Sequence, residues 1–230
     1  MLGIKNFDYR QHRRALENFF QLAECGKILR GDSRGHCDGW GIGYYQNGRA
    51  FLHKSGRSII ADKEDYFRRL EKIDRSPVLI VHLRKSAWKN TSTAEHSHPF
   101  LYKNFLFAQN GTIYDYKKLL PEITETKLPS SEALDTEVYF HYSLNSAALG
   151  LENAFRKSIQ KIEQQNKYSA LNCLFSDGKK LYAYRDYCRS PGYYTLYQAK
   201  FGKSKLISSE PVSPQLKWRM LKKRELLVVK

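Results

Sequence analysis

The alternation of apolar and polar positions predicts several amphipathic helices along the chain. In residues 8–23, Leu16, Phe19, Phe20 and Leu22 recur at the spacing that places apolar side chains on one helical face. The same criterion predicts helices over residues 8–23, 63–73, 114–120, 134–149 and 152–162. Pro121 is expected to end the helix over residues 114–120.

Shorter apolar runs bounded by turn residues predict strands. Asn47 and Gly48 separate two strand-like runs, residues 39–45 and 50–52, and both residues tolerate positive φ, so they predict a hairpin. Residues 77–84 contain four consecutive apolar side chains and predict a buried strand. The remaining predicted strands cover residues 105–108, 171–175, 181–184, 193–196, 206–208 and 226–229.

The order of these elements predicts an α+β fold. Hairpin strands come first, two central helices follow, and more hairpin strands come last. Adjacent hairpins form antiparallel sheets, and each sheet needs a cover on its apolar face. We therefore expect two sheets with helices packed outside them. No linker or internal repeat divides the sequence, so residues 1–230 are expected to form a single domain.

Composition narrows the class of protein. The hydrophobic share of 41% is typical of a globular chain. The four cysteines include no C-x-x-C pair, so neither a disulfide framework nor a zinc knuckle is indicated, and a reducing cytoplasm is expected. No apolar run approaches the roughly 20 residues that span a bilayer, and no secretory leader is recognisable. We expect no membrane association.

Charge is the one extreme property, with 39 Lys and Arg against 23 Asp and Glu, a net charge of +16. Such a surface attracts nucleic acid or acidic partners. The basic residues are nevertheless spread along the chain, with a mild cluster in residues 217–224, and no nucleic-acid-binding motif is present. The pattern favours an ordinary solvated surface, and a basic nucleic-acid-binding protein remains an alternative function.

Arg84 is the last residue of the predicted strand over residues 77–84, and we expect it where this buried strand meets a cleft. A guanidinium there can bind a carboxylate through two parallel hydrogen bonds. Charged residues at strand ends are usually solvated, so a surface salt bridge is the competing interpretation.

Asn110 and Gly111 follow the predicted strand over residues 105–108. A side-chain amide and a glycine N–H can direct two donors at one oxygen, as in an oxyanion hole. An ordinary Asn-Gly turn is the alternative. No clean strand follows within two residues, which weakens the hairpin interpretation.

Asp135 precedes a helical run and suits either an N-cap or the binding of a substrate ammonium. His96 and His98 lack a third metal ligand at helpful spacing, and Cys37 has no evident base nearby. No phosphate loop, dinucleotide fingerprint or zinc-protease motif occurs. We therefore expect no cofactor and no metal.

Taken in order, these motifs resemble the class II glutamine amidotransferase domain, an N-terminal-nucleophile hydrolase. The Asp-Gly-Trp-Gly form and the length are most similar to the stand-alone branch that includes the YafJ-like proteins and the yeast glutathione-degradation subunit. The similarity extends from about Leu2 to Ser209. The matched motifs are Leu2-Gly3-Ile4, Asp38-Gly39-Trp40-Gly41, His82-Leu83-Arg84, His98-Pro99-Phe100, Asn110-Gly111, Asp135-Thr136-Glu137 and Ser208-Ser209-Glu210.

The resemblance implies an αββα sandwich and a pocket for glutamine or a γ-glutamyl compound. Arg84 would bind the α-carboxylate and Asp135 the α-ammonium, while Asn110 and Gly111 would form the oxyanion hole. Gln109 departs from the family, which usually has histidine there. Any acceptor of the released ammonia would be a separate subunit.

The nucleophile of the family is an N-terminal cysteine, and the family pattern Met-Cys-x-x-(Leu/Phe)-Gly would place it three residues before Leu2. Two explanations compete: a start further upstream, or a non-catalytic glutamine-binding regulatory module. The retention of all the pocket's charge partners favours the upstream start. Little or no turnover is expected from the chain that begins at Met1.

Overall fold

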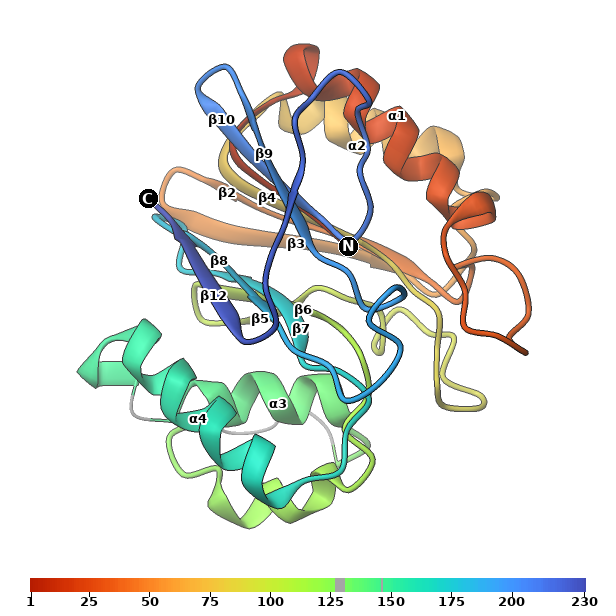
Figure 1. The fold of residues 1–230 in the computed structure, drawn as a ribbon. Coiled ribbons are helices and arrows are strands. Elements are labelled where there is room, and N and C mark those ends of the chain that lie inside the picture. Colours follow the sequence, from red (N-terminus) through yellow and green to blue (C-terminus); the bar gives the residue numbers. More distant parts are fainter. Residues whose placement is uncertain (127–130, 146) are drawn as a thin grey trace.

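Two antiparallel β-sheets lie face to face between two pairs of helices in the computed structural model (Figure 1), which describes residues 1–126, 131–145 and 147–230. The larger sheet has the strand order β11-β9-β10-β1-β4-β2-β3 and the smaller sheet the order β12-β8-β7-β6-β5. Helices α1 and α2 cover the outer face of the larger sheet, and α3 and α4 cover that of the smaller one (Figure 1). The predicted αββα sandwich is confirmed.

The larger sheet consists of β1 (Leu2–Asp8), β2 (Trp40–Gln46), β3 (Arg49–Ser55), β4 (Arg75–Leu83), β9 (Tyr197–Phe201), β10 (Ser204–Ser208) and β11 (Arg219–Met220). The smaller sheet consists of β5 (Phe100–Tyr102), β6 (Phe105–Asn110), β7 (Asn172–Ser176), β8 (Leu181–Arg185) and β12 (Glu225–Val229). The helices are α1 (Tyr9–Cys25), α2 (Lys63–Ile73), α3 (Asp135–Ser143) and α4 (Leu151–Gln165), with short 3₁₀ helices η1 (Tyr116–Glu122) and η2 (Ala147–Leu149).

Local sequence explains where α1 begins and which face it buries. The side chain of Asp8 accepts a hydrogen bond from the backbone N–H of Gln11 at 3.1 Å, which satisfies one of the amide donors left free at a helix start. Leu16, Phe19 and Phe20 of the apolar stripe are buried against the larger sheet, and Leu22 is partly buried beside them. The predicted helix is confirmed, and it continues to Cys25.

The Asn-Gly turn forms the predicted hairpin between β2 and β3. Asn47 and Gly48 both have positive φ, 50° and 75°, and the pair Gln46–Arg49 closes the turn. Such a two-residue turn matches the right-handed twist of the strands that it joins. The register brings Trp40, at the opposite end of the hairpin, beside the end of β4.

Two predicted helices differ from the structure. Residues 134–149 do not form one helix: α3 ends at Ser143, and the side chain of Asn145 bonds to the backbone of Thr124 and of Glu122 instead, which draws the chain out of the helix. Residue 146 lies outside the described part of the chain. The segment at residues 114–120 is a 3₁₀ helix that includes Pro121 rather than an α-helix that stops before it.

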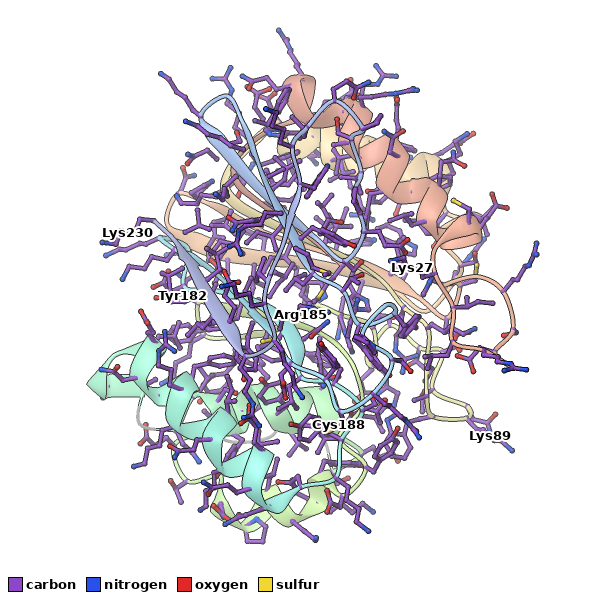
Figure 2. The ribbon with its side chains drawn as sticks, viewed as in Figure 1. Lys27, Lys89, Tyr182, Arg185, Cys188 and Lys230 are labelled. Atoms are coloured by element: carbon purple, nitrogen blue, oxygen red, sulfur yellow. The ribbon has the colours of Figure 1, made fainter. Side chains whose placement is uncertain are left out.

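One predicted strand, residues 193–196, was wrong, because those residues form turns before β9 begins at Tyr197. Arg185, buried in the interior (Figure 2), donates to the carbonyl oxygens of Pro191, Tyr194 and Leu221, and these bonds hold the segment in its turned path. The predictions also omitted β1, β5, β9 and β11. In the described residues no helix is both long and apolar enough to cross a membrane.

Candidate active site

A cavity of about 510 Å³ lies where β1 begins and where β4 and β6 end. Met1 precedes β1, Arg84 follows β4 and Asn110 ends β6, and the antiparallel pairing of β1 with β4 brings Met1 and Arg84 to the same edge of the sheet. Arg84, Asn110, Gly111 and Asp135 all line this cavity together with Met1. Five positions separated by up to 134 residues in the sequence therefore surround one cavity.

Arg84 is almost completely buried, with 4% of its surface exposed. One terminal nitrogen donates to the carbonyl oxygen of Thr91 at 2.7 Å, and the other donates to the hydroxyls of Ser86 and Thr91, both at 3.0 Å. Burial lowers the pKa of the guanidinium, and the nearby carboxylates of Asp38 and Asp135 oppose that shift. The side chain is a buried, preoriented cation rather than a member of a surface salt bridge.

Asp135 is the first residue of α3, and it is not the N-cap, which is Leu134. Its oxygens accept hydrogen bonds from Trp88 Nε1 and from the backbone N–H of Ile113, both at 2.9 Å. Burial raises the pKa of this carboxyl group, and the two donors act in the opposite direction. A carboxylate that is held in this way beside the cavity suits the recognition of a cation.

The segment of residues 85–91, which we call the bridging loop, contacts both of these charged residues. Ser86 and Thr91 bond to Arg84, and Trp88 bonds to Asp135. Lys89 lies at the outer tip of the loop and extends into solvent (Figure 2). The predictions from sequence omitted these three partners, because nothing in the sequence of a short polar loop shows that it folds back onto two distant charges.

Asn110 and Gly111 occupy the cavity wall beyond the end of β6. Gly111 has a φ of +143°, and a Cβ at this position would lie 2.0 Å from the carbonyl oxygen of Ala170. The adjacent Thr112 exchanges hydrogen bonds with Ser169, so the backbone is fixed against that neighbouring segment. Only glycine fits here, and Gly111 and Asn110 lie side by side in the cavity wall.

His82, two residues before Arg84, also lines the cavity. Its Nε2 lies 3.1 Å from the carbonyl oxygen of Gln109 and 3.1 Å from Oδ1 of Asn110. The ring of His98 packs on it with 4.3 Å between centroids. The sequence held a signal for this residue, since positions two apart on a strand face the same side, and Arg84 had already been placed at a cleft.

The α-amino group of Met1 is buried at the cavity and donates to the hydroxyl of Ser209 at 3.2 Å. Burial lowers the pKa of this group to about 5, although the negative charge of Glu210 acts against the shift. Ser209 is held in turn by its own N–H, which donates to the carbonyl oxygen of Met1.

Other candidate chemistry receives no support from the geometry. No group of three or more metal-binding side chains occurs in the part of the chain that the structure describes, and His96 and His98 instead line the cavity wall. Cys37 is exposed, with its sulfur 3.8 Å from the carbonyl oxygen of Ala23.

Comparison with known proteins gives a consistent result. The sequence profile described as "Glutamine amidotransferases class-II" matches residues 18–230. The uncharacterized protein MJ1515 of Methanocaldococcus jannaschii is 32% identical over 167 residues, a match that covers 67% of this chain. This alignment spans only 44% of that protein's length.

Solved structures share the fold at low sequence identity. A class II glutamine aminotransferase domain protein from Silicibacter pomeroyi has a TM-score of 0.64 at 18% identity and covers 82% of this chain and 86% of its own. Glutamine phosphoribosylpyrophosphate amidotransferase from B. subtilis has a TM-score of 0.69 at 19% identity, covering 99% of this chain and 46% of its own. A predicted glutamine amidotransferase from Pseudomonas aeruginosa has a TM-score of 0.58 at 15% identity, with coverage of 99% and 96%.

Two of these neighbours are close to this chain in extent, since the match covers 86% and 96% of their own length. The family profile covers most of the sequence, and solved class II glutamine amidotransferase structures share the fold. This chain belongs to the class II glutamine amidotransferase family.

Proposed function

We propose that this protein cleaves the γ-amide of glutamine or of a γ-glutamyl compound. The observation that carries the proposal is the single cavity that Arg84, Asn110, Gly111, Asp135 and Met1 share. A buried cation and a buried anion on its walls complement the carboxylate and the ammonium of a free amino acid. The side chain of that amino acid then extends toward the two N–H donors at the end of β6.

The nucleophile in this proposal is a cysteine two residues before Met1. The start of β1 delivers the backbone into the cavity, so a short extension of the strand would place its side chain among the lining residues. The cysteine sulfur attacks the γ-carbonyl carbon, and its own α-amino group takes the thiol proton. Asn110 and Gly111 donate to the oxygen that becomes negatively charged in the tetrahedral intermediate.

The remaining steps follow from the same groups. When the C–N bond breaks, the α-ammonium returns its proton to the leaving nitrogen, and ammonia or an amine departs. The thioester is then attacked by water, which releases glutamate and restores the thiol. If an acceptor uses the ammonia, we propose that it is a separate protein. No step requires a metal or a cofactor.

The test is to add Met-Cys and one further residue before Met1 and to measure the glutamate released from glutamine. We expect hydrolysis by this variant, none by a matched variant with Met-Ser at the same place, and none by the chain that begins at Met1. If the cysteine variant neither hydrolyses glutamine nor is labelled by a glutamine-like electrophile, the enzymatic proposal fails.

Calorimetry distinguishes the non-catalytic alternative. A regulatory binding module would bind glutamine without cleaving it in any of these variants, and Arg84→Ala would abolish the binding heat. An enzyme would show both binding and turnover, and both would be lost in Arg84→Ala.

A further inference from the structure

His82 contacts both of the groups that shape the oxyanion corner. It is 3% exposed, on the next-to-last position of β4, and β4 belongs to the larger sheet whereas Asn110 belongs to the smaller one. Its Nε2 is equally close, 3.1 Å, to the backbone carbonyl oxygen of Gln109 and to the side-chain oxygen of Asn110. The imidazole thus links the two sheets at the cavity.

The chemistry of the carbonyl group decides where the ring proton lies. A backbone carbonyl oxygen only accepts hydrogen bonds, so Nε2 of His82 must carry a proton in order to bond to Gln109. Burial, the neighbouring His98 and the amino terminus all lower the pKa of His82 well below its usual value, so the ring is neutral. The neutral ring with its proton on Nε2 leaves Nδ1 bare, and among the described residues Nδ1 has no hydrogen-bond partner.

The same proton decides which end of the Asn110 amide faces the histidine. An N–H donor at 3.1 Å requires an acceptor, which is Oδ1 of the amide; the reversed amide would set its NH₂ group against the N–H of His82. With Oδ1 held by the histidine, the NH₂ group is the end left for the cavity. Asn110 lines that cavity beside Gly111.

We propose that His82 is a positioning residue for the oxyanion hole: its Nε2–H bonds to Gln109 and Asn110 and thereby orients the Asn110 amide with its NH₂ group toward the cavity. His82 does not touch the reacting carbonyl. The ring of His98 packs against the ring of His82 at a tilt of 45°, with 4.3 Å between centroids, and restrains its rotation. The consequence for turnover rests on the proposed function, whereas the hydrogen bonds themselves do not.

The first experiment uses the protein labelled with ¹⁵N at histidine and needs no activity. A long-range ¹H–¹⁵N correlation spectrum should show His82 with a protonated Nε2 and a bare Nδ1 at neutral pH. In uniformly ¹⁵N-labelled protein, His82→Leu should shift the side-chain amide signals of Asn110. A proton on Nδ1 alone, or an imidazolium, would overturn the proposal whether or not the protein is an enzyme.

The second experiment measures kinetics in the variant that carries the added N-terminal cysteine. His82→Leu should lower kcat by about 10²-fold, the effect of losing one oxyanion donor, with KM for glutamine nearly unchanged. His82→Gln, whose side-chain NH₂ can donate to the same acceptors, should recover part of that loss.

The matched control is His12→Leu, which removes another buried histidine. His12 lies in the first turn of α1, its Nδ1 contacts the backbone of Asp8, and it is not among the residues that line the cavity. This control should lose stability but retain kcat. If His82→Leu and His12→Leu have equal kcat values, or if His82→Gln recovers nothing, a merely structural role is indicated and the proposal is wrong. Absence of turnover in every variant, including the one with unchanged pocket residues, would instead refute the proposed function.

Discussion

Asp135 shows how one buried side chain can be prepared for a ligand of opposite charge. Its two oxygens already accept N–H donors from Trp88 and Ile113, and these donors offset part of the effect of burial, which raises the pKa of the carboxyl group. Those donors also fix its orientation. A ligand ammonium would then meet an acceptor that needs no rearrangement.

We expect Asp135→Asn to weaken glutamine binding by about 10- to 100-fold, because a hydrogen bond to a charged group contributes about 1.5–3 kcal/mol. The amide would also set its NH₂ group against one of the two existing donors. Isothermal titration calorimetry measures the change. Asp115→Asn is the control, since Asp115 also accepts a backbone N–H but does not line the cavity, and its affinity should not change. Unchanged affinity in Asp135→Asn would exclude the ammonium-binding role.

Glu137 lies in the first turn of α3 and gives the protein a dependence on pH. Burial raises the pKa of its carboxyl group to about 7 despite the positive charge of Lys54. The folded protein therefore holds a proton that the unfolded chain releases between the ordinary pKa of 4.5 and about 7. Because the native state binds more protons in this window, this group makes the free energy of unfolding fall as pH rises through it.

Glu137→Gln should remove that decline, and the variant should gain stability relative to the parent as pH rises from about 4.5 to about 7. Each unit of pKa shift corresponds to about 1.4 kcal/mol, so the difference should reach a few kcal/mol at most. Urea unfolding at a series of pH values gives the slope. Identical slopes for the two proteins would show that Glu137 has an ordinary pKa.

At the scale of elements, two glycines with positive φ differ in their surroundings. Gly48 closes the β2–β3 hairpin, and a Cβ there would have nothing within 4 Å. Gly111 follows β6, and a Cβ there would lie 2.0 Å from the Ala170 carbonyl oxygen. The first requires glycine only for its backbone angle, whereas the second also requires it for space.

Gly48→Ala should cost about 1–2 kcal/mol, the penalty of a left-handed conformation for an L-residue. Gly111→Ala should cost distinctly more, because β6 and the segment around Ala170 must also move apart. Thermal unfolding of the two variants gives the comparison. Equal losses would mean that the corner at Gly111 is loosely packed.

The elements that were predictable from sequence are those with a local physical cause. The stripe of Leu16 and Phe19 indicated α1, and the Asn47-Gly48 turn fixed a hairpin, because helix and turn signals depend on neighbours in sequence. The path of residues 193–196 depends instead on the buried side chain of Arg185. It donates to the carbonyl oxygens of Tyr194 and Leu221, which lie nine and 36 positions away in the sequence. Strand β1 was missed because its apolar run is short, and its extended conformation depends on pairing with β4 and β10, which are distant in the sequence.

The candidate site divides in the same way. Arg84 and Asn110 follow apolar strands, so their placement at strand ends could be inferred from pattern, and the family resemblance added roles to them. The contacts of Trp88 with Asp135 and of His82 with Asn110 join segments 47 and 28 positions apart. No periodicity in the sequence encodes contacts of that kind.

At the scale of the whole molecule, the net charge of +16 is distributed around a small sandwich with three apolar layers. Like charges on a compact surface repel one another and destabilise the folded state. Many of the ion pairs are exposed, such as Arg13 with Glu17 and Arg156 with Glu152, and contribute little to stability. Repulsion should therefore dominate the response to salt.

We expect the Tm to rise by a few degrees between about 10 mM and about 150 mM NaCl, as the Debye length falls from roughly 30 Å to about 8 Å. A variant with Lys217→Gln and Lys222→Gln should respond less, because it carries less charge to screen. Differential scanning calorimetry is the measurement. A Tm that falls with salt would mean that attractive pairs outweigh the repulsion.

The bridging loop has a consequence for ligand selectivity. Because residues 85–91 contact both Arg84 and Asp135, the two side chains that we propose as anchors for the ends of a zwitterion share one support. A ligand that lacks either the carboxylate or the ammonium would leave this shared support less restrained. The losses of binding free energy for two analogues, one without each charged group, should therefore add up to more than the loss for a ligand that lacks both groups. Selectivity for ligands that carry both charged groups, over ligands that carry one, would then depend on the bridging loop as a unit.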